Sequence, residues 1–174
     1  MTSLELSSVM NEVRENMEKI GIDCSAHIRE IKFTGQRRTW GRCYKTRGWG
    51  GGEIYRITIS DMLQKKGVDP NALKSVVAHE VLHTCPKCWT HTGEFSRLAD
   101  ILEEKYGYKI KEHIAEGLGV PDEVKYDEPY VIECSECGQK YAYNRRKKWF
   151  KYIEKCGCGN CQKRGTLKFT KGGV

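Results

Sequence analysis

The chain has 174 residues, of which 39% are hydrophobic and 30% are charged, and its mean hydropathy is −0.64. This composition is typical of a soluble globular protein and argues against a disordered or membrane-embedded chain. No apolar run reaches the roughly 18 residues that span a bilayer, and no secretory signal is recognisable, so we expect a cytoplasmic protein without a membrane partner. The length suits one ordinary domain with a small appendage.

The net charge of +7 is distributed unevenly along the chain. Residues 134–174 contain 11 Lys and Arg against 2 acidic residues, which gives +9. Residues 1–133 contain 19 against 21, which gives −2. Such asymmetry suggests that the C-terminal segment meets a polyanion while the rest of the chain does different work.

Nine cysteines are many for a cytoplasmic chain, and an odd number cannot all form disulfides. Six of them form Cys-x-x-Cys pairs, which in a reducing compartment indicate metal binding: Cys85 with Cys88, Cys134 with Cys137, and Cys158 with Cys161. We interpret Cys24 and Cys43 as small, buried apolar residues.

The N-terminal half predicts one helix followed by strands. Apolar side chains recur at helical spacing over the first twenty residues, where Thr2 and Glu5 have capping-box spacing and Gly21 favours a helix end. Three strands are then predicted, at residues 29–34, 38–44 and 53–60. The glycine-rich segment 48–52 predicts a hairpin turn or a mobile loop between the last two strands.

Two further helices are predicted before a linker. Asp69 followed by Pro70 is a strong helix start, and the helix should run to Thr84 with its apolar face formed by Leu73, Val77 and Val81. A second apolar stripe over residues 95–106 should end at Gly107. We interpret residues 111–129, with their glycines, prolines and scattered acids, as a linker.

The first of these two helices carries the pattern His-Glu-x-x-His, formed by His79, Glu80 and His83. Residues four apart lie one helical turn from each other, so both imidazoles can reach one metal ion. Glu80 projects about 100° around the helix from His79, where it can accept a proton without being a ligand. The alternative is a helix with two surface histidines, but the apolar face turned away from them favours a catalytic zinc site.

A catalytic zinc ion needs a third protein ligand. His91 follows the motif across a loop that contains Pro86, and it is one candidate. Three acidic residues on the next predicted helix are the others: Asp100, Glu103 and Glu104. Spacing alone favours His91 only modestly.

The stretch from Ala78 to Phe95, AHEVLHTCPKCWTHTGEF, resembles the core of the SprT-like family, which includes the Spartan DNA-dependent proteases. In that family a histidine shortly before Gly, Glu and Phe is the third zinc ligand, so the resemblance implies this role for His91. The resemblance extends over nearly the whole chain. It implies a zincin-like peptidase that acts on proteins attached to DNA.

Several supporting roles stay open at this stage. Donors for the tetrahedral oxyanion are sought among Tyr106, Tyr108 and Arg97. The strand at 53–60 either pairs with an extended substrate or is an interior strand. We interpret Cys85 and Cys88 as shaping the loop that carries His91, with a thiol intruding on the zinc or a loop disulfide as alternatives.

The C-terminal cysteines have the spacing of a tetrathiolate site that would hold a structural zinc: Cys134, Cys137, Cys158 and Cys161. The segment is too small and polar to build a core, so this zinc would supply the missing folding energy. Cys156 can replace Cys158 by spacing, but the resemblance favours Cys158.

Between the two cysteine pairs, aromatic residues flank a run of four cations. We expect strand, basic turn and strand, with the cations at the tip of a hairpin. Cations neutralise phosphates and aromatic rings stack on unpaired bases, so the segment predicts binding of DNA, especially single-stranded DNA. The residues concerned are Arg145, Arg146, Lys147, Lys148 and Trp149. The alternative is a solvated turn over core aromatics.

The sequence thus predicts an α+β protein with a zincin-like domain and small antiparallel sheet at 1–128, and a basic zinc ribbon at 129–174. The predicted function is a zinc metalloendopeptidase, with Glu80 as catalytic base and one catalytic and one structural zinc ion, that acts on DNA-associated proteins. The alternatives are a non-enzymatic nucleic-acid-binding regulator and a peptidase unrelated to DNA.

Overall fold

The computed structural model describes residues 3–36, 39–110, 120–121, 124 and 128–172. The chain divides into two compact units, Met1–Pro121 and Asp122–Val174. The sequence had predicted a boundary after residue 128, within the expected linker 111–129, most of which lies outside the described residues. The protein has α+β architecture, with one small sheet in each unit. Among the described helices, none is both long and apolar enough to cross a bilayer.

The first unit begins with α1, Ser3–Lys19. Its apolar stripe is buried as expected, since Leu6, Val13 and Met17 are fully inaccessible. The helix ends at Lys19, and the turn after it contains Gly21, whose φ of 79° is favourable for glycine and whose N–H donates to the carbonyl of Glu18 at 3.0 Å. The proposed capping residue Thr2 lies outside the described residues.

The sheet of the first unit contains β1 (His27–Thr34), β2 (Gly41–Arg47) and β3 (Glu53–Ser60) in the order β1-β3-β2. The predicted antiparallel sheet is wrong in one respect, because β3 pairs antiparallel with β2 but parallel with β1. The glycine-rich turn places β2 beside β3, and Gly48 N–H donates to Gly52 O at 2.8 Å. β3 is therefore the central strand with both edges paired, so it is an interior strand and cannot receive a substrate strand.

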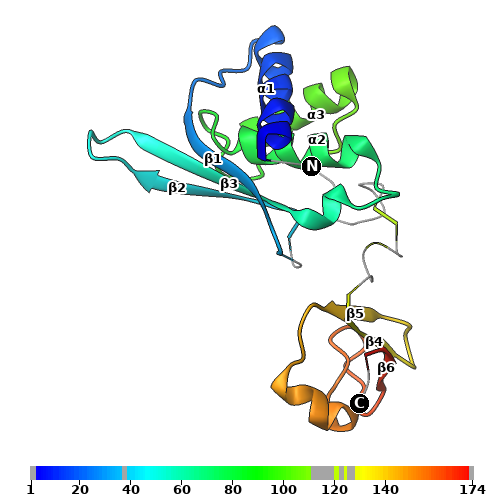
Figure 1. The fold of residues 1–174 in the computed structure, drawn as a ribbon. Helices are drawn as coiled ribbons and strands as arrows, with labels where there is room; N and C mark the ends of the chain where they lie inside the picture. The colour runs from blue at the N-terminus through cyan, green and yellow to red at the C-terminus, as the bar shows by residue number, and fades with distance from the viewer. Residues whose placement is uncertain (1–2, 37–38, 111–119, 122–123, 125–127, 173–174) are drawn as a thin grey trace. The chain divides into compact units, whose positions relative to one another are not determined.

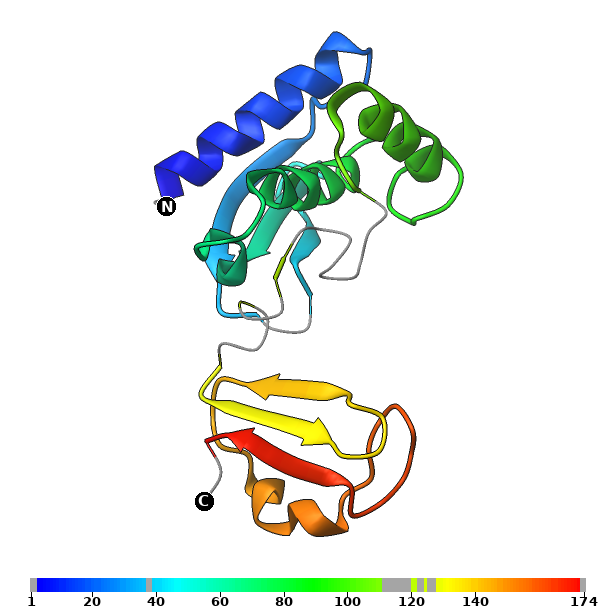
Figure 2. The ribbon, with the colours of Figure 1, turned by 90° about the vertical axis from the view of Figure 1, so that its right-hand side faces the viewer.

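The helices α1 and α2 (Pro70–Leu82) pack against one face of this sheet (Figures 1 and 2). A short 3-10 helix, η1 (Asp61–Gln64), leads from β3 toward α2. The predicted cap is confirmed, because the Asp69 side chain accepts the Asn71 N–H at 2.8 Å. The helix α3, Glu94–Tyr106, ends at Gly107, as predicted, and Gly107 adopts the left-handed conformation.

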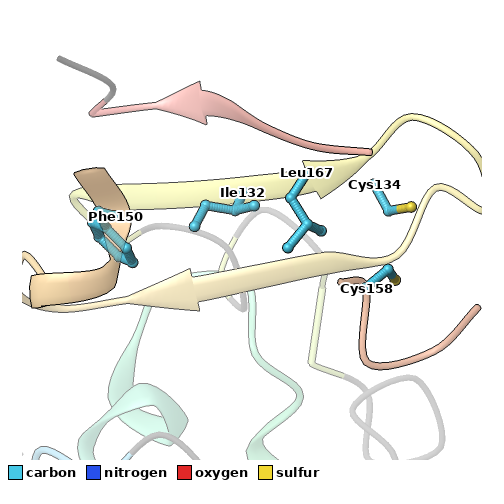
Figure 3. Close-up of a cluster of buried hydrophobic side chains, with 5 residues drawn as sticks. All are labelled: Ile132, Cys134, Phe150, Cys158 and Leu167. Carbon is cyan, nitrogen blue, oxygen red and sulfur yellow. The ribbon is translucent and has the colours of Figure 1, made fainter. Parts of the chain in front are cut away.

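The second unit is built on β4 (Tyr130–Cys134), β5 (Lys140–Tyr143) and β6 (Leu167–Lys171), in the antiparallel order β5-β4-β6. Its small core contains three apolar side chains and two cysteines, which Figure 3 shows between the strands and the helical segment: Ile132, Phe150, Leu167, Cys134 and Cys158. A core of this size needs additional stabilisation, which a metal ion can supply.

The predicted hairpin with a basic tip is wrong. β5 is followed by a bend at residues 144–145, two irregular residues and then the 3-10 helix η2, Lys148–Lys155, rather than by a second strand. The physical reason is the adjacent pair Trp149 and Phe150. A strand would point these rings to opposite faces, whereas a helical turn brings both toward the same core. Their ring centroids lie 4.8 Å apart, and both contact Tyr143.

Candidate metal centres and catalytic cavity

Three histidines converge in the first unit. His79 and His83 lie one turn apart at the end of α2, and His91 lies in the loop that leads to α3. Their Nε2 atoms form a triangle with sides of 3.2 Å (His79 to His83), 3.0 Å (His79 to His91) and 3.1 Å (His83 to His91). Two nitrogen ligands of a tetrahedral zinc ion, each about 2.05 Å from the metal, are about 3.3 Å apart. The triangle therefore fits a zinc-sized ion.

Backbone carbonyls fix the orientation of two of these rings. His79 Nδ1 lies 2.7 Å from Ile110 O, and His83 Nδ1 lies 3.0 Å from Cys88 O. A carbonyl can only accept, so each Nδ1 carries a proton, and each Nε2 of a neutral ring presents a lone pair. Burial also lowers the pKa of His83, which favours the neutral form. Lone pairs that face each other this closely repel unless a cation lies between them.

The ring of Phe95 contacts all three histidine rings. It is 2% exposed in the first turn of α3, and its ring centroid lies 5.1, 4.9 and 5.0 Å from those of His79, His83 and His91. Among the described residues, the acidic candidates for the third ligand are not in this group: Asp100, Glu103 and Glu104. The structure thus brings together the histidine set that the resemblance implied.

Glu80 points toward the same cavity from α2. It is 5% exposed, and its carboxylate accepts the backbone N–H of Cys43 on β2. Burial raises the pKa of Glu80 to about 8, and the Cys43 N–H and the charge of Arg42 oppose this shift. A carboxylate with a raised pKa is a stronger base than an exposed one.

Gly41 makes room for this carboxylate. A Cβ atom at Gly41 would lie 2.7 Å from Glu80 Cγ and 2.8 Å from Val76 Cγ1, and it would also meet Glu80 Oε1. Both distances are far below ordinary carbon contacts of about 3.5 Å. The sequence analysis missed Gly41 and the Cys43 amide. The only available signal was a glycine where a predicted strand should have a side chain.

The cavity that contains these groups has a volume of about 400 Å³. It is lined by the three histidines, Glu80 and the start of β2, and also by Trp89 and Lys109. None of the three proposed oxyanion donors lines it. Tyr108 is buried, and its hydroxyl oxygen accepts a hydrogen bond from Asn16 Nδ2 at 2.9 Å. Tyr106 stacks on Tyr108, and Arg97 forms an ion pair with Glu94.

The loop cysteines support the site through the backbone. Cys88 provides the carbonyl that His83 contacts, and its N–H donates to Cys85 O at 3.2 Å, which closes the turn. Neither thiol joins the histidine group, and no disulfide forms among the described cysteines. Cys24 is buried as predicted, whereas Cys43 is only half-buried and contributes its amide to Glu80.

The second centre is formed by four cysteines of the second unit, whose sulfur atoms all lie within 4.8 Å of one another: Cys134, Cys137, Cys158 and Cys161. Two of the Sγ–Sγ distances are 3.7 Å (Cys134 to Cys161) and 3.6 Å (Cys137 to Cys158). Thiolates in a tetrahedral zinc site, at about 2.3 Å from the metal, are about 3.8 Å apart. The cluster can therefore hold such an ion.

Each cysteine pair forms the same tight turn. Gly138 N–H donates to Cys134 O at 2.9 Å, and Gln162 N–H donates to Cys158 O at 2.8 Å. Both donors have positive φ, 69° at Gly138 and 60° at Gln162. A hydrogen bond from Tyr141, at 3.2 Å, and the Cys161 amide lower the pKa of Cys158 to about 6, which favours the thiolate.

Cys156, the alternative by spacing, stays outside the cluster, and its thiol faces Tyr152 O at 3.4 Å.

The predicted nucleic-acid residues adjoin η2. Arg145, Arg146 and Lys148 are exposed, and Lys147 is half-buried. Trp149 is also half-buried and packs on the core of the unit, so part of its ring surface is already used. Exposed cations are thus present here, whereas the Trp149 ring is accessible only on the side that the core leaves open.

Comparisons of the chain with protein-family models, with curated proteins and with solved structures find no match.

Proposed function

We propose that this protein is a zinc-dependent metalloendopeptidase with a zincin-like active site, related to the SprT-like family, that acts on DNA-associated proteins. The observation that carries the proposal is the arrangement in one cavity of three converging Nε2 atoms and a buried glutamate. A purely structural metal site has no use for an adjacent buried carboxylate, whose desolvation is costly.

The three histidines would hold the zinc ion, which lowers the pKa of a water molecule to about 7 and polarises a carbonyl group. Glu80 then accepts the proton of the attacking water on its carboxylate and passes it to the leaving amine nitrogen. The Cys43 amide orients the carboxylate for both transfers. Lys109, which lines the cavity, is the cation available to a developing oxyanion.

The substrate path follows β2 rather than β3. In the described sheet β2 is the edge strand beside the cavity, and its residues Gly41–Cys43 line the cavity wall. An edge strand offers unpaired backbone groups with which an extended peptide can pair. A peptide bound in this way would place its backbone beside the three histidines.

The second unit supports the DNA-associated part of the proposal. Residues 134–174 have a charge of +9, and their four-cysteine cluster fits a structural zinc ion. A cationic unit gains affinity for phosphates by counterion release, which the slightly acidic residues 1–133 cannot provide as a whole. This asymmetry favours a peptidase directed to nucleic acid over one unrelated to it.

The test uses the purified full chain, with metal content measured alongside cleavage of casein and histone, with and without single-stranded DNA. We expect zinc-dependent cleavage that DNA stimulates. Glu80→Gln keeps the shape of the side chain but not the base, so it should abolish cleavage and retain the zinc.

A protein that binds zinc and DNA but cleaves neither substrate under any condition would instead be the non-enzymatic regulator. Cleavage that DNA leaves unchanged would indicate a peptidase unrelated to DNA.

A further inference from the structure

The hairpin formed by β2 and β3 carries a cationic and aromatic surface in the first unit. From Trp40 to Gly52 the chain contains three cations, Arg42, Lys45 and Arg47, and no acidic residue. Two of its three aromatic side chains are accessible. Tyr44 is 42% exposed, and Trp49, in the turn, is fully exposed.

Strand alternation separates this segment into two faces. Gly41 and Cys43 face Glu80, and Lys45 Nζ lies 4.7 Å from the ring centroid of Trp89 on the same side. Side chains of successive residues in a strand point to opposite faces, so Arg42, Tyr44 and Thr46 lie on the outer face.

The outer face continues onto the neighbouring strand. Tyr44 is paired with Arg56 of β3, and the Arg42 guanidinium lies 5.9 Å from the Tyr44 ring centroid. Arg56 is exposed, although it also contacts Glu30 at 3.3 Å. Two arginines therefore flank an accessible aromatic ring.

The turn presents its tryptophan outward. Hydrogen bonds from Gly48 N–H to Gly52 O and from Gly51 N–H to Gly48 O close the turn and leave the Trp49 side chain fully exposed. Figure 1 shows this turn, drawn in cyan, extending past the helices of the first unit. With Tyr44 also accessible, the hairpin offers two exposed aromatic rings, and exposed apolar surface of this kind is found at binding sites.

We propose that the outer face of this hairpin, with Arg42, Tyr44, Trp49 and Arg56, is a second binding surface for single-stranded nucleic acid. Cations neutralise the phosphates, and Tyr44 and Trp49 stack on unpaired bases. An acidic peptide would satisfy the cations but would leave the aromatic rings without a partner.

This inference rests on the proposed function for its purpose. β2 has the catalytic cavity on one face and the nucleic-acid surface on the other, so a protein attached to the bound strand is held at the edge of the cavity. Binding itself needs no peptidase activity, so the two ideas fail separately. Binding without cleavage would leave this surface standing and remove the peptidase, and cleavage with no contribution of the hairpin to binding would do the reverse.

The experiment measures binding of the full chain to fluorescein-labelled dT20 and to a duplex of equal length over a series of salt concentrations. Trp49→Ser and Tyr44→Ser should each weaken dT20 binding about tenfold, and duplex binding less, because only unpaired bases stack freely. Trp49→Phe keeps a stacking ring and should stay close to wild type. Arg42→Ser with Arg56→Ser should reduce the slope of log Kd against log salt by about 1.4, or about 0.7 for each phosphate contact.

The matched control replaces two exposed cations elsewhere in the unit, Lys66 and Lys105, by serine. It has the same net charge as the arginine variant and should leave the dT20 affinity near wild type. Thermal unfolding checks each variant. The proposal is overturned if folded Trp49→Ser and Tyr44→Ser proteins bind dT20 as wild type does. It is also overturned if the serine substitutions abolish binding to phosphatidylserine vesicles while dT20 binding persists, because the partner is then a lipid surface.

Discussion

Gly41→Ala is a stringent test of how Glu80 is positioned, because it adds a single methyl group between β2 and α2. The added Cβ would lie 2.7 Å from Glu80 Cγ and 2.8 Å from Val76 Cγ1. Carbon atoms prefer separations of about 3.5 Å or more, so the neighbours must move by roughly 0.8 Å. The Glu80 carboxylate would be displaced from the backbone N–H of Cys43, from which it accepts a hydrogen bond.

The expected consequences differ in kind. Overpacking of this sort costs about 1–3 kcal/mol of unfolding free energy. A displacement of about 1 Å in a catalytic group costs about a hundredfold in rate, so kcat should fall by that order while KM changes little. The zinc content should be retained, because the three atoms nearest to the added Cβ belong to Glu80 and Val76 and not to a histidine.

The assay combines steady-state cleavage of a fluorogenic peptide, zinc content and urea unfolding. Gly50→Ala is the matched control, since a Cβ at Gly50 meets nothing within 4 Å. Adding Val76→Ala to Gly41→Ala should restore part of the stability but not kcat, because the contact with Glu80 remains. A folded Gly41→Ala protein with kcat within twofold of wild type would show that Glu80 does not depend on this space.

Other consequences follow for metal binding and recruitment. Two zinc ions per chain are expected, and mild chelation should remove the histidine-bound ion first, since four thiolates enclose the other; elemental analysis that finds one ion would contradict this. His91→Ala should lose the labile zinc while Glu103→Ala keeps it, and the opposite pattern would exclude His91 as the third ligand. Phe95→Leu should weaken zinc affinity about tenfold in a competition titration at a stability cost below about 1.5 kcal/mol, whereas unchanged affinity would mean that the ring does not orient the imidazoles. Serine should replace the four consecutive cations of the second unit: Arg145, Arg146, Lys147 and Lys148. This variant should bind DNA more weakly and with a flatter salt dependence, while DNA-independent peptide cleavage stays unchanged. Unchanged DNA affinity would leave the ribbon a purely structural role.

Local signals in the sequence predicted the features that depend on chain neighbours. The Asp69-Pro70 helix start, the helix end at Gly107 and the apolar face of α2 were all confirmed. Each is determined within about one helical turn, where residue type and spacing decide the conformation. The two histidines of α2 and the two cysteine pairs belong to the same class.

Contacts between distant segments could not be predicted in this way. The parallel pairing of β1 with β3, the Cys43 amide on Glu80 and the Ile110 carbonyl on His79 join residues far apart in the chain. The strand prediction for the segment from Trp149 onward was wrong for a different reason. Its aromatic residues fit either a strand or a helical turn, and the core that decides between them is tertiary.

The strand β2 connects the site around Glu80 with the proposed nucleic-acid surface, because it carries Gly41, the Cys43 amide and the exposed Tyr44. Its pairing with β3 fixes which side chains face α2, and a shift of register by one residue would exchange its two faces. Arg42 would then occupy the position of Gly41 and clash with Glu80. The outer face would lose both Arg42 and Tyr44. The closed glycine turn holds this register, because Gly48 and Gly52 are joined directly. The same turn thus maintains the space for the Glu80 carboxylate and keeps Trp49 exposed, which couples the position of the proposed base to the surface that we assign to nucleic acid.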